Sequence, residues 1–181
     1  TQNLKWESKI NLDNFGDSNL LVFNGDDISE NLDNQNLLVD QKLVYTNKLA
    51  PRKVMLLTGR YIYERSDQFY AINRFLYPEL FTEVTGTDNV AQSNDNQYHF
   101  GGFEAHLLER KSNGDLFEIQ LGNAYRNDFL NTLLELNDQS NLVTTPEDFQ
   151  NNLRYQTNDL YFKSKYLLDV KPFKLNGTIA F

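Results

Sequence analysis

Histidine and glutamate side chains near the middle of the chain are the residues best suited to acid–base or metal chemistry. The two histidines are His99 and His106, which lie seven positions apart on one predicted strand. Since successive side chains of a strand point to opposite faces, these rings cannot hold one metal ion from that strand. Glu104 and His106 do share a face, and together they could form an acid–base pair or two metal ligands. A polar pair that faces water is the simpler interpretation.

Three further motifs contain residue types used in ligand binding or modification. Residues 24–27 (Asn-Gly-Asp-Asp) and 94–96 (Asn-Asp-Asn) could supply oxygen ligands to calcium, but neither has the spacing of a calcium loop, and turn chemistry explains both. Residues 176–178 (Asn-Gly-Thr) match a glycosylation acceptor inside a predicted strand, which we interpret as a coincidence. We find no phosphate loop, nucleophile elbow or supported pair of catalytic carboxylates. We therefore predict a protein that is not an enzyme and has no catalytic, cofactor-binding or metal-binding residues.

The composition excludes several classes of protein. The 181 residues include 17 Lys and Arg against 25 Asp and Glu, a net charge of −8 that argues against a nucleic-acid partner. The absence of cysteine excludes disulfides, thiolate metal ligands and thiol nucleophiles. No apolar stretch is long enough for a transmembrane helix. The mean hydropathy of −0.58 does not bear on a transmembrane barrel, because lipid-facing and water-facing residues alternate there.

Alternation of apolar and polar residues predicts an all-β fold. In one hairpin, residues 37–49 and 54–65 flank a short turn. In a second, residues 98–110 and 116–129 flank Asn113-Gly114, a pair that favours the positive φ angles of a tight turn. Residues 155–170 and 173–181 form a third pair, and 4–12 form a first strand. We predict an antiparallel up-and-down meander of about seven long strands.

The predicted connections alternate between short and long. Tight turns are expected at 50–53, 111–115 and 171–172, and long polar loops at 13–36, 66–97 and 127–154. Residues 145–148 (Thr-Pro-Glu-Asp) predict a short surface helix within the last of these loops. Short turns at one end and long loops at the other are typical of an outer-membrane β-barrel.

Two segments carry a resemblance to a known family. Residues 41–65 (QKLVYTNKLAPRKVMLLTGRYIYER) and 97–121 (QYHFGGFEAHLLERKSNGDLFEIQL) resemble barrel hairpins of TonB-dependent receptors of the Bacteroidetes type. The resemblance lies in the general pattern of residue types, not in an invariant motif, and it extends over most of the chain. It implies a non-enzymatic role as the wall and outer loops of a receptor or transporter in the cell outer membrane.

The resemblance also implies partners. These are outer-membrane lipid, a plug domain and the remaining barrel strands of the parent chain, with a surface lipoprotein or nutrient ligand at the outer loops. The plug, the segment that contacts the energy-coupling protein and the rest of the barrel are not contained in these residues. The chain also begins without a methionine or an apolar signal core. We therefore expect residues 1–181 to be a single barrel segment, a fragment of a larger chain.

Aromatic residues give two further expectations. Tyr61, Tyr63 and Tyr125 lie toward the long-loop ends of their strands, where an interfacial aromatic girdle belongs. The aromatics of residues 68–81 could stack on a sugar or bind a surface partner, or simply pack against the barrel rim; they are Phe69, Tyr70, Phe75, Tyr77 and Phe81.

One alternative fold stays open. A soluble β-barrel or sandwich would show the same alternation, with its apolar face covered by protein and a site for a small ligand or carbohydrate.

Overall fold

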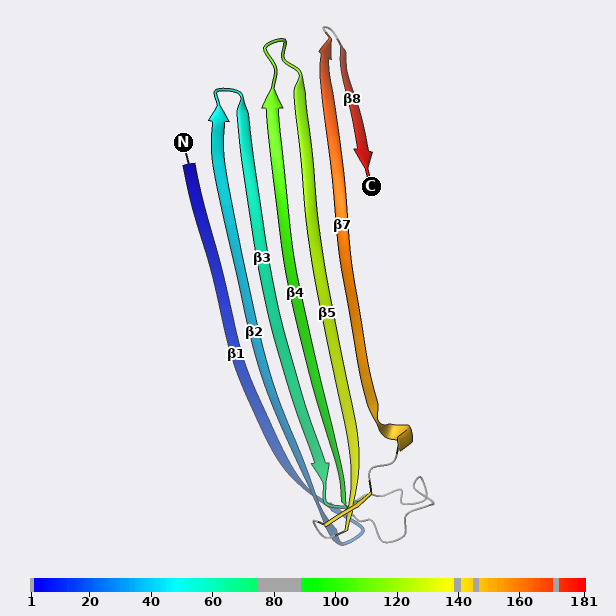
Figure 1. Cartoon of the computed structure of the whole chain (residues 1–181). Helices are drawn as coiled ribbons and strands as arrows, with labels where there is room; N and C mark the ends of the chain where they lie inside the picture. Colours follow the sequence, from blue (N-terminus) through cyan, green and yellow to red (C-terminus); the bar gives the residue numbers. More distant parts are fainter. Residues whose placement is uncertain (1, 75–88, 139–140, 145–146, 171–172) are drawn as a thin grey trace.

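The protein is a single antiparallel β-sheet (Figure 1). The computed structural model describes residues 2–74, 89–138, 141–144, 147–170 and 173–181. The strands are β1 (Gln2–Phe23), β2 (Asp26–Ala50), β3 (Lys53–Ile72), β4 (Asn89–Arg110), β5 (Leu116–Asp138), β6 (Asn141–Thr144), β7 (Asn151–Val170) and β8 (Phe173–Ala180). A 3₁₀ turn, η2 (Glu147–Phe149), precedes β7. Among these residues no helix is long and apolar enough to cross a membrane.

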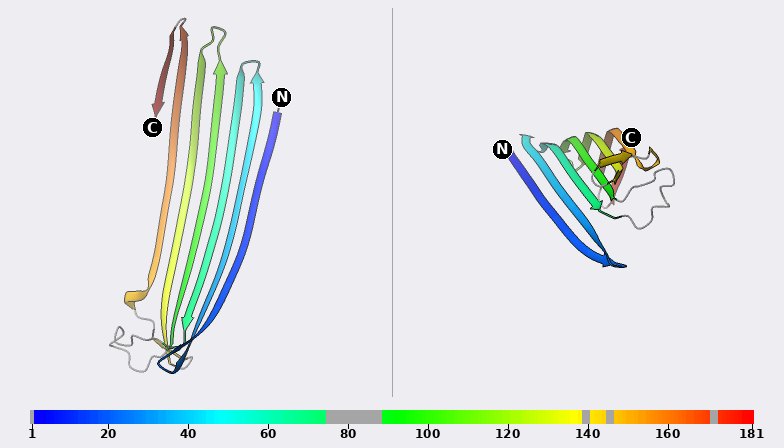
Figure 2. Two further views of the ribbon diagram at one scale, coloured as in Figure 1. Left: turned by 180° about the vertical axis from the view of Figure 1, so that it is seen from behind. Right: turned by 90° about the horizontal axis from the view of Figure 1, so that it is seen from below.

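The strand order confirms the predicted meander. The sheet runs β1-β2-β3-β4-β5-β7-β8, every neighbouring pair is antiparallel, and the short β6 pairs only with β5. The sheet is open, with β1 at one edge and β8 at the other. Figure 2 shows the same layer from behind and from below, and β1 begins and β8 ends toward the end that carries the tight turns.

The three predicted hairpins are present. β2 and β3 close at the pair Ala50↔Lys53 with a register shift at Lys48, and β4 and β5 close at Arg110↔Leu116. β7 and β8 close at Val170↔Phe173. In the second hairpin the turn covers residues 111–115, as predicted, and of its Asn-Gly pair only Gly114 has a positive φ, of 100°.

The predicted long loops are largely strand, and here the sequence-based prediction was wrong. Residues 13–36 continue β1 and β2 into one long hairpin, whose tip is Asn24-Gly25 with φ angles of 52° and 86°. Most of the last loop belongs to β5, β6 and β7, and the predicted surface helix is the turn η2. Of the middle loop, 66–72 belong to β3 and 89–97 to β4, while Phe75, Tyr77 and Phe81 lie outside the described residues.

The error has a simple physical cause. Polar residues at successive positions show only that both faces of a segment are exposed to solvent. They do not decide whether its backbone groups pair with a neighbouring strand. From Asp13 to Phe23 every residue of β1 does pair with β2.

The register divides the side chains between two faces. Directly opposed residues of neighbouring strands share a face, so the pairs given by the register can be followed across the sheet as rows. One face carries Trp6, Leu43, Leu57, Phe103, Leu121 and Phe162, and we call it the apolar face. The other carries Lys42, Arg60, Glu104, His106, Glu118 and Lys163, and we call it the charged face.

The β4–β5 turn is held by a buried carboxylate. Asp115 is only 3% exposed. Its oxygens accept hydrogen bonds from the backbone N–H of Asp169 at 3.0 Å, the amide of Asn113 at 2.7 Å and the hydroxyl of Tyr166 at 2.9 Å. The bond from Asp169 does most to lower the pKa of Asp115, followed by those from Asn113 and Tyr166. These bonds link the β4–β5 turn to β7.

This network predicts an acid-sensitive turn. Because the folded pKa lies below the ordinary value of 3.8, the charged carboxylate stabilises the fold fully above that value, and its contribution is lost as the pH falls through the folded pKa. Asp115→Asn should lower the urea midpoint at pH 7 and reduce the loss between pH 7 and pH 3. Asp13→Asn, at an exposed position of β1, is the matched control. Equal effects of the two substitutions would contradict the assignment.

Candidate functional site

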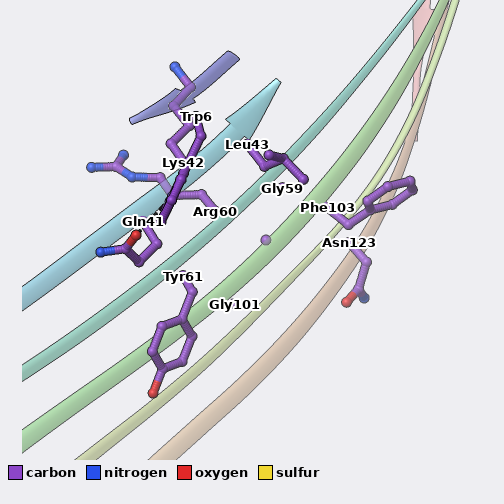
Figure 3. A pocket seen from close by; sticks show the side chains of 11 residues that line it. Trp6, Gln41, Lys42, Leu43, Gly59, Arg60, Tyr61, Gly101, Phe103 and Asn123 are labelled. Atoms are coloured by element: carbon purple, nitrogen blue, oxygen red, sulfur yellow. Dashed lines mark hydrogen bonds between the residues drawn. The ribbon is translucent and has the colours of Figure 1, made fainter. Parts of the chain in front are cut away.

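The apolar face has a shallow hollow over two glycines. Trp6, Leu43, Gly59, Phe103 and Asn123 form one row of directly opposed residues across five strands. In the next row Gly101 lies opposite Tyr61. A Cβ built on Gly59 or Gly101 would meet nothing within 4 Å, so neighbouring side chains leave this space open. The resulting hollow has a volume of about 550 Å³. Figure 3 shows the side chains that line it.

The lining of the hollow includes large apolar side chains that the sheet itself does not cover. Trp6 is 70% exposed and Phe103 is 53% exposed. Surfaces of this kind mark an interaction with a partner or a membrane.

Polar groups on the apolar face bond to one another within the sheet. The Trp6 indole N–H donates to Gln41 Oε1 at 2.9 Å, and Gln41 Nε2 donates to Ser8 Oγ at 2.6 Å. Asn123 Nδ2 donates to Asn158 Oδ1 at 2.7 Å. These bonds lower the cost of placing indole, amide and hydroxyl groups in an apolar environment.

The predicted girdle tyrosines lie on the apolar face. Tyr61 and Tyr63 belong to β3, and Tyr125 lies two strands away on β5. The Tyr61 hydroxyl is 3.4 Å from His99 Nδ1, and the rings of Tyr63 and His99 are 4.8 Å apart. His99 therefore belongs to this aromatic group, whereas His106 lies on the charged face, as strand alternation predicted.

Ion pairs run across the charged face of the first three strands. Arg60 makes a two-pronged contact with Asp40, through Nε to Oδ1 at 3.0 Å and Nη2 to Oδ2 at 2.7 Å. On β1, Lys5 and Glu7 approach to 2.5 Å. Charged side chains therefore lie on one side of the sheet at the level where the other side is apolar.

A second cluster on the charged face is centred on Glu104. Its carboxylate accepts hydrogen bonds from the Tyr161 hydroxyl and from Gln120 Nε2, the latter at 2.6 Å. His106 Nε2 lies 2.6 Å from Glu104 Oε1 without the alignment of a hydrogen bond, and its Nδ1 is 3.6 Å from Glu118. The prediction that Glu104 and His106 share a face is confirmed.

Gly122 allows this cluster to span three strands. It lies on β5 directly between Glu104 of β4 and Tyr161 of β7. A Cβ at this position would overlap the Tyr161 ring. Because Gly122 has no side chain, the tyrosine can lie across β5 and bond to a carboxylate two strands away. The sequence shows all three residues, but their alignment depends on a register between distant segments.

The remaining sequence motifs have structural places. Asn24-Gly25 is a hairpin tip, and Asp26 beside it pairs with Arg74 at 2.7 Å. Asp95 lies within β4 and accepts hydrogen bonds from Gln97 at 3.3 Å. Residues 176–178 lie in β8. Within the described part of the chain, no group of three or more His, Asp or Glu residues could hold a metal ion.

Comparison of the sequence with protein family models gives no match, and comparison with curated proteins gives none either. Function therefore has to be argued from the two faces of the sheet.

The Glu104 cluster predicts an unusual sensitivity at Gly122. Gly122→Ala should displace the Tyr161 ring and cost about 1–3 kcal/mol of stability, in the range of overpacking substitutions. Gly101→Ala adds the same methyl group to open space on the neighbouring strand and should cost little. In a Tyr161→Ala background the cost of Gly122→Ala should largely vanish. Urea unfolding of the wild-type chain, Gly122→Ala, Tyr161→Ala and the double variant forms a double-mutant cycle that measures this coupling, and a coupling near zero would contradict the geometry.

Proposed function

We propose that this chain is a wall segment of a transmembrane β-barrel, with the non-enzymatic role of an outer-membrane receptor or transporter of the TonB-dependent type. The apolar face meets lipid, and the charged face lines the water-filled or plugged interior. The observation that carries the proposal is the shape of the apolar surface.

The apolar surface is a band of nearly constant width. On each long strand of the sheet, five alternating positions of the apolar face, most of them apolar or glycine, span nine residues. Polar residues follow at both ends of each stretch except on β7, where Val170 extends the stretch by one position. The polar boundaries include Lys53 and Arg65 on β3, and Gln97 and Glu109 on β4. Nine residues is at the short end of the roughly 9–11 that a transmembrane strand needs. The stretches are 4–12, 37–45, 55–63, 99–107, 117–125 and 160–168.

The band also slants in one direction across the strands. At the end nearer the long connections, the last band residue of each strand lies in the same row as a residue of β3, which marks its level. That β3 residue is Arg65 for β1 and β2, Tyr63 for β3 and β4, Tyr61 for β5 and Gly59 for β7. This is a drift of six residues, or about 20 Å, over a sheet width of about 24 Å. The strands are therefore tilted on the order of 40° from the perpendicular to the boundaries of the band, within the roughly 35–45° of transmembrane barrels.

A flat slab of hydrocarbon accounts for both features. A bilayer has two parallel surfaces, so it favours a similar apolar length on neighbouring tilted strands and a boundary that moves in one direction across the sheet. A protein core follows the shape of whatever packs on it and imposes neither condition. The alternative of a soluble sandwich therefore accounts for the alternation but leaves the similar width and the slant unexplained.

The proposal determines the partners. In lipid every backbone group needs a hydrogen bond, so the open edges at β1 and β8 require the remaining strands of the barrel. A plug domain is the proposed partner of the charged face. At the end of the sheet that carries the long connections, the strands extend beyond the band. A surface lipoprotein or nutrient ligand would bind there.

The single tryptophan of the chain provides a direct test. In phospholipid vesicles, Trp6 fluorescence should be quenched by lipids with brominated acyl chains and protected from aqueous iodide. With Trp6→Phe in place, Phe103→Trp should behave in the same way, whereas Phe100→Trp, on the charged face, should resist brominated lipid. Quenching by iodide alone at Trp6 and at position 103 would contradict the membrane assignment and favour the soluble alternative.

Charge placement gives a second test. Leu57→Arg should destabilise the vesicle-bound protein by about 2–4 kcal/mol, because it places a cation inside the band on the lipid side. Thr58→Arg places the same charge one residue away on the charged face and should cost much less. Urea unfolding in vesicles measures both, and equal costs would show that the two faces have the same environment.

A further inference from the structure

A hollow of about 580 Å³ lies between two of the tight turns, at the end of the sheet opposite the long connections. The β2–β3 turn and the β4–β5 turn are neighbours because β3 pairs with β4 (Figure 1). The backbone N–H of Arg110 donates to the carbonyl oxygen of Arg52 at 2.8 Å, which ties one turn to the other. The hollow lies on the charged face, because Val54 and Leu108 in its lining follow the same alternation as the charged residues of β3 and β4.

Three cationic side chains line this hollow, and no acidic residue of the described chain does. They are Arg52, Arg110 and Lys111, and all three are exposed. Arg52 and Arg110 each lie one residue beyond the opposed pair Lys53 and Glu109, so two like charges face each other across neighbouring strands. Opposed like charges destabilise a sheet. An anion held between the two guanidinium groups would remove this repulsion.

The other arginines of the chain are paired. Four of the seven lie within 2.8 Å of a carboxylate oxygen, and these are Arg60, Arg65, Arg74 and Arg126. A fifth, Arg154, donates to the amide oxygen of Asn127 at 3.1 Å. Within the described part of the chain, only the side chains of Arg52 and Arg110 have no such partner, although acidic residues outnumber basic ones by 25 to 17. The two arginines that line the hollow are therefore the ones left to bind an external anion.

The rest of the lining is largely aliphatic. Val54 and Leu108 are directly opposed on β3 and β4, and Leu116 lies opposite Arg110 on β5. All three aliphatic side chains are partly exposed, and Pro51 lines the hollow beside them. A ligand that fills this space therefore has an anionic end and an apolar body. The volume is in the range of small-molecule sites.

We propose that this hollow binds a small phosphate monoester with an apolar substituent. Arg52 and Arg110 would bond to the phosphate oxygens through their planar donor pairs, and Lys111 would add a third positive charge. The Ser112 hydroxyl would supply a further donor. The apolar substituent would lie against the aliphatic lining. This site goes beyond the proposed barrel function and does not rest on it, because the register alone places the hollow on the charged face.

Charge and position favour this ligand over three others. A phosphate monoester carries nearly a double negative charge at neutral pH, so it matches three cations better than a carboxylate does. An organic cation would be repelled. A bilayer phospholipid carries the same phosphate chemistry, but the apolar band that would hold its chains lies on the opposite face of the sheet from Val54 and Leu108.

Isothermal titration calorimetry of the purified chain tests the site with phenyl phosphate as the probe. Inorganic phosphate lacks the apolar body, benzoate carries a single negative charge and benzyltrimethylammonium has the opposite charge, so all three should bind more weakly. Arg52→Gln and Arg110→Gln should each weaken phenyl phosphate binding about tenfold, the effect of losing hydrogen bonds to a charged group. The matched control is Arg126→Gln, which removes the same charge from the same face outside the hollow and should leave binding unchanged.

A second variant and a second readout separate the two halves of the site. Val54→Ala should weaken the binding of phenyl phosphate but not that of inorganic phosphate. In urea unfolding without added anion, Arg110→Gln should raise the midpoint, because it removes the opposed like charge. Phenyl phosphate should raise the midpoint of the wild-type chain much more than that of Arg110→Gln, since a ligand stabilises only the form that binds it.

Each outcome has a definite meaning. Tighter binding of phenyl phosphate than of benzoate, weakened in Arg52→Gln and Arg110→Gln and kept in Arg126→Gln, supports the site. Absence of phenyl phosphate binding overturns the proposal, as do equal losses in all three arginine variants or equal binding of benzyltrimethylammonium. Binding to vesicles that contain phosphatidic acid, without binding of phenyl phosphate, would assign the anion to a lipid headgroup and overturn the proposed ligand.

Discussion

The antiparallel backbone ladder is the constraint on which the rest of this protein depends. In long paired strands each side chain points to one of only two faces. Directly opposed residues share a face, so the face of a residue on one strand fixes that of its partner on the next. A slip of one residue between β2 and β3 would move Arg60 to the apolar face and Tyr61 to the charged face. The two faces, the slanted band and the Glu104 cluster all follow from this pairing.

Glycine and aromatic residues shape both faces by complementary means. On the apolar face, Gly59 and Gly101 leave space that their opposed partners, Phe103 and Tyr61, do not fill. On the charged face, Gly122 provides space that Tyr161 does fill, so that β7 is tied to β4 across β5. A missing side chain thus opens a surface in one case and joins three strands in the other. The difference depends on whether the neighbouring ring lies over the glycine or stands beside it.

Much of the fold could be predicted from the sequence because the evidence for a hairpin is local. Asn113-Gly114 marks a turn, and the alternation on either side of it predicts two strands and their faces. The prediction failed for residues 13–36, where polar side chains on both faces removed the alternation although the strands continue. The opposite faces of His99 and His106 followed from their odd spacing, whereas the Tyr161–Glu104 contact had no local signal, since 57 positions separate these residues.

The sequence by itself determined which residues alternate, where the three tight turns lie and that no cysteine contributes. These properties depend on neighbours within a few positions of one another. Only the tertiary structure decided how the strands align, and therefore that the apolar stretches form one slanted band. Alignment is set by hydrogen bonds between strands, and the step from one strand to the next cannot be obtained from the alternation of either strand alone.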